Sequence, residues 1–145
     1  PLFGDNMRRR LSAIFPQVGT ILKNPVDTGG ASVLDLNKYR ELLQVIVADP
    51  DTNVILLIEA VEVFLQFLSL EAIYALNDIF IDLNQRKPFV IVSPPGLAER
   101  ERLLIEEKLS AAQIPIYPTV ERAAKAILHL TQYWRFRGEL NESAL

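Results

Sequence analysis

Residues 24–32 of this chain, NPVDTGGAS, have the composition of an anion-binding loop. Pro25 stiffens the chain before a turn, and the adjacent Gly29 and Gly30 let successive backbone N–H groups point toward one place without an obstructing Cβ. An amphipathic helix is expected directly after the loop, and the N-terminus of a helix carries a partial positive charge. The spacing therefore predicts a binding site for an anion, with phosphate as the first candidate.

Apolar runs and amphipathic stretches alternate along the rest of the chain. Continuous apolar runs bounded by polar residues are typical of buried parallel strands, and apolar repeats of three and four residues are typical of helices. We expect strands over residues 54–58, 89–92 and 116–117, and helices over residues 36–47, 70–83, 99–112 and 120–134. This alternation predicts an α/β protein, a flavodoxin-like three-layer α/β/α sandwich with a mainly parallel sheet. Three strands are few for such a sheet, so we expect a further N-terminal strand outside this sequence.

Several polar residues are placed to begin or end these helices. Asp5 is expected to cap a short first helix that Pro16 ends, Asp35 to cap the second helix, and Thr119 to cap the last one. In the last two helices, the side chains expected to face the core are Leu104, Leu109, Val120, Ala123, Ala124, Ile127, Leu128 and Thr131.

Composition limits the classes of protein to consider. The 145 residues are half hydrophobic and suit one domain, which we place at residues 1–134, followed by a polar tail or linker at 135–145. A net charge of −3 with dispersed basic residues argues against nucleic acid as a partner, and acidic residues interrupt the longest apolar stretch, which argues against a membrane span. The absence of cysteine excludes disulfides, thiol nucleophiles and cysteine-ligated zinc, and favours a cytoplasmic setting. The chain begins at Pro1, so we expect a piece of a longer protein.

Six landmarks in a fixed order resemble a known family. They are the loop NPVDTGGAS, a Tyr-bearing helix ending in ADPD, the strand VILLI, then KPFVIV, IPIYPT and ERAAKAI. Together they span roughly residues 11–134 and are similar to the NDP-forming acyl-CoA synthetases. More narrowly, they resemble the flavodoxin-like ligase domain that corresponds to the C-terminal domain of the succinyl-CoA synthetase beta subunit.

This resemblance implies a ligase that converts acyl-CoA, ADP and phosphate into the free acid, CoA and ATP through a phosphohistidine supplied by another domain. Gly29, Gly30, Ala31 and Ser32 would bind the phosphoryl group, and Asp27 would shape the turn before them. The expected partners are CoA-binding, phosphohistidine and ATP-grasp domains or subunits of the same synthetase, and a homo-oligomer stays open. ATP or ADP, CoA and Mg²⁺ are expected in the full-length enzyme, with none bound by this chain alone and no metal site or catalytic residue within it.

Other residues with chemical potential are given structural interpretations. His129, the only histidine, lies within the last expected helix and is interpreted as a surface or core-edge residue rather than a catalytic one. Asp49 and Asp51 are interpreted as turn residues. Glu59 and Glu62 follow a central strand, where ligands bind in such sheets, yet solvated loop residues are the favoured interpretation. Residues 8–10, three arginines, are interpreted as a solvated helix face rather than a nucleotide-phosphate site.

Alternative functions stay open. A regulatory or scaffolding copy of this domain would have the same sequence features, including one in a protein acetyltransferase. An FMN-binding flavodoxin or a phospho-acceptor receiver domain is less favoured. Receivers need an acidic cluster and a lysine at strand ends that this chain does not offer, and DTGGAS has only two hydroxyls for a flavin phosphate.

Overall fold

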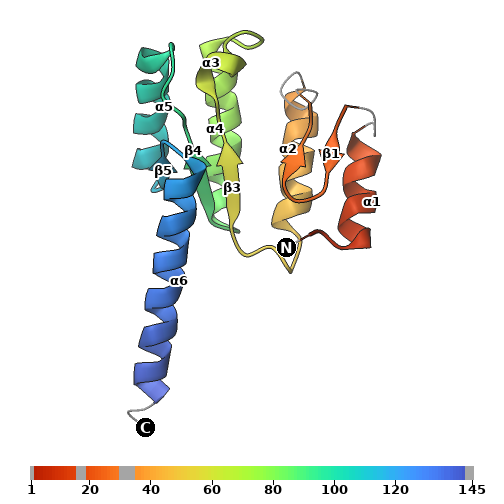
Figure 1. The fold of residues 1–145 in the computed structure, drawn as a ribbon. Helices are drawn as coiled ribbons and strands as arrows, with labels where there is room; N and C mark the ends of the chain where they lie inside the picture. Colours follow the sequence, from red (N-terminus) through yellow and green to blue (C-terminus); the bar gives the residue numbers. More distant parts are fainter. Residues whose placement is uncertain (1, 16–18, 30–34, 143–145) are drawn as a thin grey trace.

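The computed structural model describes residues 2–15, 19–29 and 35–142 and has a mixed α/β fold (Figure 1). Its elements in chain order are α1 (Asp5–Ile14), β1 (Ile21–Leu22), β2 (Val26–Asp27), α2 (Leu36–Val47), β3 (Ile55–Ile58), α3 (Val61–Phe64), α4 (Leu70–Asn84), β4 (Phe89–Val92), α5 (Glu99–Ala111), β5 (Ile116–Tyr117) and α6 (Val120–Glu142). The expected α/β class, the three strands and the alternation of strands with helices are therefore confirmed.

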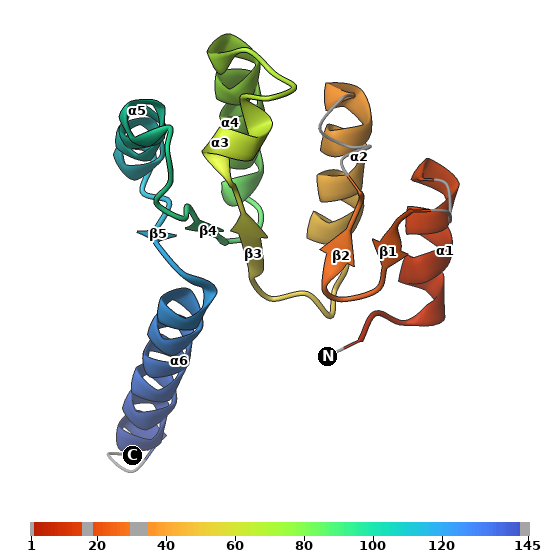
Figure 2. The ribbon, with the colours of Figure 1, turned by 45° about the horizontal axis from the view of Figure 1, so that its top comes forward.

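Strands β3, β4 and β5 form a parallel sheet in that order. Ile58 lies opposite Val92, and Ile91 lies opposite Ile116. Both crossovers step in the same direction across the sheet, so their helices, α4 and α5, lie on the same face. Figure 2 shows α1, α2, α4 and α5 in a row on one side of the strands, and α6 on the other side.

The main hydrophobic core lies between the sheet and this row of helices. Phe80 of α4 is fully buried at its centre, with its ring centroid 6.0 Å from that of Tyr39 in α2 and 6.1 Å from that of Phe89 in β4. Aromatic rings at this separation pack favourably beyond their area of burial. This chain of rings connects the N-terminal helices to the parallel sheet.

Strands β1 and β2 form a separate antiparallel hairpin, in which Ile21 lies opposite Asp27 and Leu22 opposite Val26. Within the described residues the hairpin does not join the parallel sheet, and β3 pairs with a neighbour along one edge only. We expected β3 to be buried on both faces. Its position at the edge of the described sheet explains why it is more exposed than that. Ile55 is buried, whereas Ile58 is 55% exposed.

The last helix differs from its expectation in length and in packing. It continues to Glu142 rather than ending near Trp134. Of the side chains expected to face the core, Ala123 is buried and Ile127 is half-buried, whereas Val120, Ala124, Leu128 and Thr131 are exposed. The reason is that three short strands offer little surface, and the C-terminal half of α6 extends past them (Figure 1).

Two further expectations need correction. Asp5 is the first residue of α1, and Gly4 occupies the N-cap position. In α5 the inward residues are Ile105 and Leu109, which are fully buried, whereas Leu104 is 41% exposed. The expectation for Leu109 is therefore confirmed and that for Leu104 is wrong, because Leu103, Leu104 and Ile105 are consecutive apolar residues and the sequence does not decide which of them faces the core.

The other cap predictions are confirmed where residues are described. The Asp35 carboxylate accepts hydrogen bonds from the backbone N–H groups of Asn37 and Lys38, at 3.0 and 3.2 Å. The Thr119 hydroxyl accepts one from the N–H of Arg122 at 3.2 Å. Pro16 lies outside the described residues.

The observed burial in α5 predicts different costs for alanine substitution at two of its leucines. Leu109→Ala should lower the free energy of unfolding by about 2–5 kcal/mol, because it leaves a cavity in the core. Leu104→Ala, the matched control, should cost less than about 1 kcal/mol, because its side chain is largely in solvent. Urea unfolding followed by circular dichroism measures both values, and a larger cost at Leu104 would contradict the described packing.

Candidate functional site

The predicted anion loop begins with a turn that Asp27 holds. The Asp27 Oδ1 accepts a hydrogen bond from the backbone N–H of Gly29 at 2.8 Å. Carboxylates that bond to an N–H two residues ahead form a tight local turn. This bond is the kind of interaction expected of a loop-shaping residue at position 27.

Gly29 has two structural reasons to be glycine. Its φ of +57° lies in the left-handed region, which residues with a Cβ rarely adopt. A Cβ at this position would also lie 2.1 Å from the carbonyl oxygen of Gly19. The chain therefore closes tightly between the turn and the segment that leads into β1.

The remaining predicted phosphate-binding residues, Gly30, Ala31 and Ser32, lie outside the described residues. Among the described N–H groups around this loop, that of Gly29 bonds to Asp27, and those of Asn37 and Lys38 bond to Asp35. These three donors are already paired with carboxylates. Binding of an anion here thus depends on the residues between them.

A second group of polar side chains lies at the carboxyl ends of β3 and β4, where ligands bind in parallel α/β sheets. Glu59 follows β3 and donates its N–H to the carbonyl of Val92, and Ser93 is the next residue of the neighbouring strand. Residues two apart along a strand share a face, so the parallel register places both side chains on the face that α4 covers. Asn77 of α4 donates from Nδ2 to Glu59 Oε1 at 3.2 Å.

The burial of Glu59 corrects the expectation of a solvated loop residue. Glu59 and Asn77 are 0% exposed, and Ser93 is 1% exposed. Sequence reasoning missed this because the hydrogen-bond partner of Glu59, Asn77, lies 18 residues further along the chain. The available signal was the position of Glu59 on the same face as Ile55 and Leu57.

Burial alters the ionisation of this region. It raises the pKa of Glu59 from 4.5 to about 7, since the charged carboxylate loses its hydration, while the hydrogen bond from Asn77 acts in the opposite direction. The pKa of Tyr39 in α2 is raised above its ordinary value by burial and by the adjacent Glu59 charge. Glu59 is therefore the one carboxyl among the described groups whose shifted pKa is close to neutrality.

Each side chain of this cluster also has an atom with an unmet hydrogen bond. Glu59 Oε2, Asn77 Oδ1 and Ser93 Oγ are buried and have no hydrogen-bond partner among the described residues. An unpaired buried polar atom is costly, on the order of 1–3 kcal/mol. Two of the three atoms accept only, and the Ser93 hydroxyl can also donate, so a proton on the Glu59 carboxyl would supply a second donor for the unpaired acceptors.

Glu62 holds the neighbouring loop instead of facing a ligand. It is exposed, and its Oε2 accepts a hydrogen bond from the N–H of Leu97 at 2.7 Å. A Cβ on Gly96 would lie 2.2 Å from the same oxygen, so a larger residue there would require the Glu62 side chain to shift. This contact joins α3 to the loop between β4 and α5.

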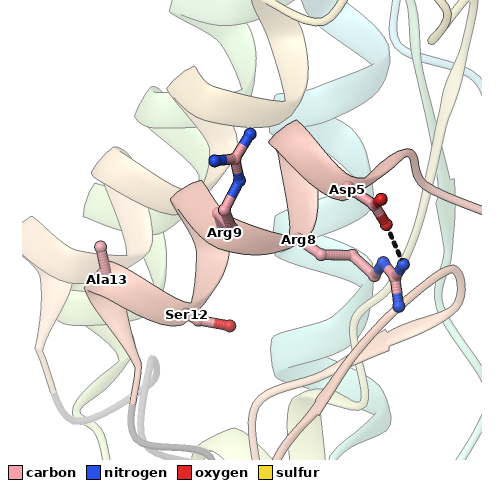
Figure 3. A pocket seen from close by; sticks show the side chains of 5 residues that line it. All are labelled: Asp5, Arg8, Arg9, Ser12 and Ala13. Carbon is pink, nitrogen blue, oxygen red and sulfur yellow. Dashed lines mark hydrogen bonds and ion pairs between the residues drawn. The ribbon is translucent and has the colours of Figure 1, made fainter.

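A pocket on α1 is lined by two of the three arginines that the sequence singled out, Arg8 and Arg9 (Figure 3). Its lining side chains, Asp5, Arg8, Arg9, Ser12 and Ala13, all come from this one helix. Arg8 forms an ion pair with Asp5, and residues 8–10 are exposed. The arrangement matches the interpretation of a solvated helix face.

The other residues considered from the sequence have structural surroundings. His129 is exposed on α6. Thr52 donates its hydroxyl to Asp49 Oδ2 at 2.8 Å and its N–H to the Asp49 carbonyl, as expected for a turn. Within the described ranges, no three metal-ligating side chains converge on one point. No helix in the described part of the chain has the length and apolar character needed to cross a membrane.

Comparisons with models of known protein families, with curated proteins and with solved structures find no match to this chain.

The turn geometry predicts unequal effects of alanine at two glycines. Gly29→Ala should cost more than about 2 kcal/mol of unfolding free energy, because a left-handed φ and a contact with the Gly19 carbonyl act together. Gly19→Ala, the control, has a φ of +80° but no atom within 4 Å of the added Cβ, so it should cost about 1 kcal/mol. Equal costs in chemical denaturation would show that Gly29 is not closely approached.

Proposed function

We propose that this chain is the ligase-type accessory domain of an NDP-forming acyl-CoA synthetase. In this proposal it helps bind the phosphoryl group of a phosphohistidine while the full enzyme converts acyl-CoA, ADP and phosphate into acid, CoA and ATP. The observation that carries the proposal is the Asp27–Gly29 turn, placed before α2 in a parallel α/β protein. The six ordered landmarks of the sequence support the same assignment.

The chemistry of the turn is suited to a dianionic group. The Gly29 N–H already donates to Asp27, so the N–H groups of residues 30–32 would donate to the phosphate oxygens, and charge-assisted hydrogen bonds of this kind are the stronger ones in proteins. The macrodipole of α2 would add roughly 0.3–1 kcal/mol. Because Asp27 and Asp35 already engage nearby donors, we assign most of the binding to Gly30, Ala31 and Ser32.

The covalent centre would come from elsewhere. His129 is exposed on α6, which makes it a helix-surface residue and unsuited to a mobile phosphohistidine loop. The proposed partners are therefore the CoA-binding, phosphohistidine and ATP-grasp domains or subunits of the same synthetase, with ATP or ADP, CoA and Mg²⁺ bound there. The proposed compartment is the cytoplasm.

The proposal also gives the finer fold. We assign a flavodoxin-like three-layer sandwich in which a further N-terminal strand pairs with β3. The support is that β3 pairs along one edge only within the described residues, while the β1–β2 hairpin lies apart from the sheet. The family has a Gly-rich segment upstream of its Asn-Pro-Val-Asp run. The additional strand would place this segment next to the proposed site.

A second candidate function is a regulatory or scaffolding domain of an acyl-CoA-synthetase-like protein. The observation that favours it is that the N–H groups of Gly29, Asn37 and Lys38 are already bonded to carboxylates. A loop whose donors are internally satisfied can be a structural turn alone. The two functions make different predictions for a negative charge added at the loop. It should lower acyl-CoA-dependent ATP formation if the loop binds the phosphoryl group, and leave that activity unchanged if the loop is only structural.

The test uses Gly30→Glu in the full-length synthetase. A carboxylate at this position should repel a phosphoryl group, since like charges brought together cost several kcal/mol. We expect acyl-CoA-dependent ATP formation to fall by about tenfold or more, a loss of about 1.4 kcal/mol or more.

Gly138→Glu is the matched control, because it adds the same charge on α6 where nothing lies within 4 Å of the new Cβ. Its activity should equal that of the wild type. Full activity of a folded Gly30→Glu protein would reject the phosphoryl-binding role and favour the scaffolding function.

A further inference from the structure

The buried cluster of Glu59, Asn77 and Ser93 contains an ionisable carboxyl with few hydrogen-bond partners, which distinguishes it from the apolar packing around it. Glu59 is fully buried, yet it receives a single side-chain hydrogen bond, from Asn77 at 3.2 Å. Asn77 Nδ2 also donates to the carbonyl of Ile73 at 2.9 Å, which fixes the orientation of its amide. The unpaired atoms of all three side chains lie within the same buried region.

The elements around Glu59 bring no compensating cation. Tyr39, from α2, is the titratable group that interacts with it. On α4, the next residue after Asn77 is Asp78, which is exposed and forms an ion pair with Lys108 of α5 at 2.7 Å. On α3, the Glu62 carboxylate bonds to the Leu97 N–H. Among the described residues no lysine, arginine or histidine forms an ion pair with Glu59.

We propose that Glu59 is a pH-sensitive switch that keeps α2 and α4 closed against the carboxyl ends of β3 and β4 when protonated, and loosens them when ionised. In the closed form the carboxyl is neutral and its hydroxyl donates to an acceptor within the cluster. On ionisation the proton leaves to solvent. The carboxylate keeps its hydrogen bond from the Asn77 amide, and no described lysine, arginine or histidine forms an ion pair with it.

A buried carboxylate in this position must gain water or move toward it, because an uncompensated charge in an apolar interior is strongly unfavourable. The elements that separate Glu59 from solvent are those that would move. These are α2, through Tyr39, and α4, through Asn77. The inference does not rest on the proposed ligase function, since it follows from the burial and bonding of this cluster.

The direction of the pH effect follows from where the proton binds. The folded protein holds it to a higher pH than the unfolded chain, because the pKa of Glu59 is raised from 4.5 to about 7. Both states are protonated below about pH 4.5, so the full stability is present there. As the pH rises, the unfolded state ionises first and stability falls, until it becomes constant above the folded pKa.

The test compares the wild type with Glu59→Gln, which imitates the neutral acid at every pH. Hydrogen exchange of the backbone amides around Tyr39 and Asn77, corrected for the intrinsic effect of pH, should lose protection in the wild type as the pH rises from about 5 to about 8. In Glu59→Gln the protection should stay constant. The wild-type folding equilibrium should weaken by about two orders of magnitude relative to that of Glu59→Gln over this transition.

Glu41→Gln is the matched control, since Glu41 is exposed on the same helix as Tyr39. It should retain the wild-type pH response. A direct titration of the Glu59 side-chain carboxyl by carbon-13 NMR keeps the inference testable if Glu59→Gln does not fold. A midpoint near 4.5, or the same pH-dependent loss of protection in Glu59→Gln, would overturn the switch.

Discussion

The structure depends on the contact between α2 and α4, because the N-terminal elements have no strand in the described parallel sheet. The rings of Tyr39 and Phe80 pack against each other in this contact, and the fully buried Phe80 also packs against Phe89 of β4. Without it, α1, α2 and the β1–β2 hairpin would have little to hold them against β3. The turn at Gly29 is positioned relative to the rest of the fold through this packing, since it leads toward α2.

The same region contains buried polar side chains with unpaired atoms. Glu59 interacts with Tyr39 and receives one side-chain hydrogen bond, while its Oε2 and the nearby Asn77 Oδ1 and Ser93 Oγ have no hydrogen-bond partner among the described residues. Packing that joins two halves of a domain is expected to be apolar, and a buried acid there lowers stability when it ionises. Costly polar groups of this kind occur more often at functional positions than in purely structural cores. The carboxyl ends of β3 and β4 are thus held against α4 by apolar contacts, and their stability depends on the ionisation of Glu59.

Regular elements were predictable from local patterns in the sequence. The spacing of apolar residues gave α2 and α4, Asp35 marked the start of α2, and the run Phe89–Val92 gave the buried central strand. The predictions that were wrong concern side chains whose burial depends on tertiary neighbours. Leu104 and Ile105 are both apolar, and only the packed structure decides which one faces the core. The burial of Glu59 depends on α2, on Asn77 and on the register with Ser93, none of which a local pattern contains.

The candidate phosphate loop was predictable only in part. The sequence identified Gly29 as a turn residue, and its left-handed φ and its bond to Asp27 agree with that expectation. It gave no sign that Gly19 would approach Gly29. These contacts restrict the predicted anion site to a few residues, which makes the proposal sharper.

The central claim is that the segment from Gly29 to Ser32 binds a phosphoryl group. Amide NMR of this chain, titrated with inorganic phosphate, tests it most directly, with the Gly29 amide as the reporter within the described turn. The proposal predicts saturable shifts confined to residues 29–32 and the start of α2, and their loss in Gly30→Glu. An absence of shifts there, with the remaining spectrum intact, would contradict the proposal and leave the loop as a structural turn.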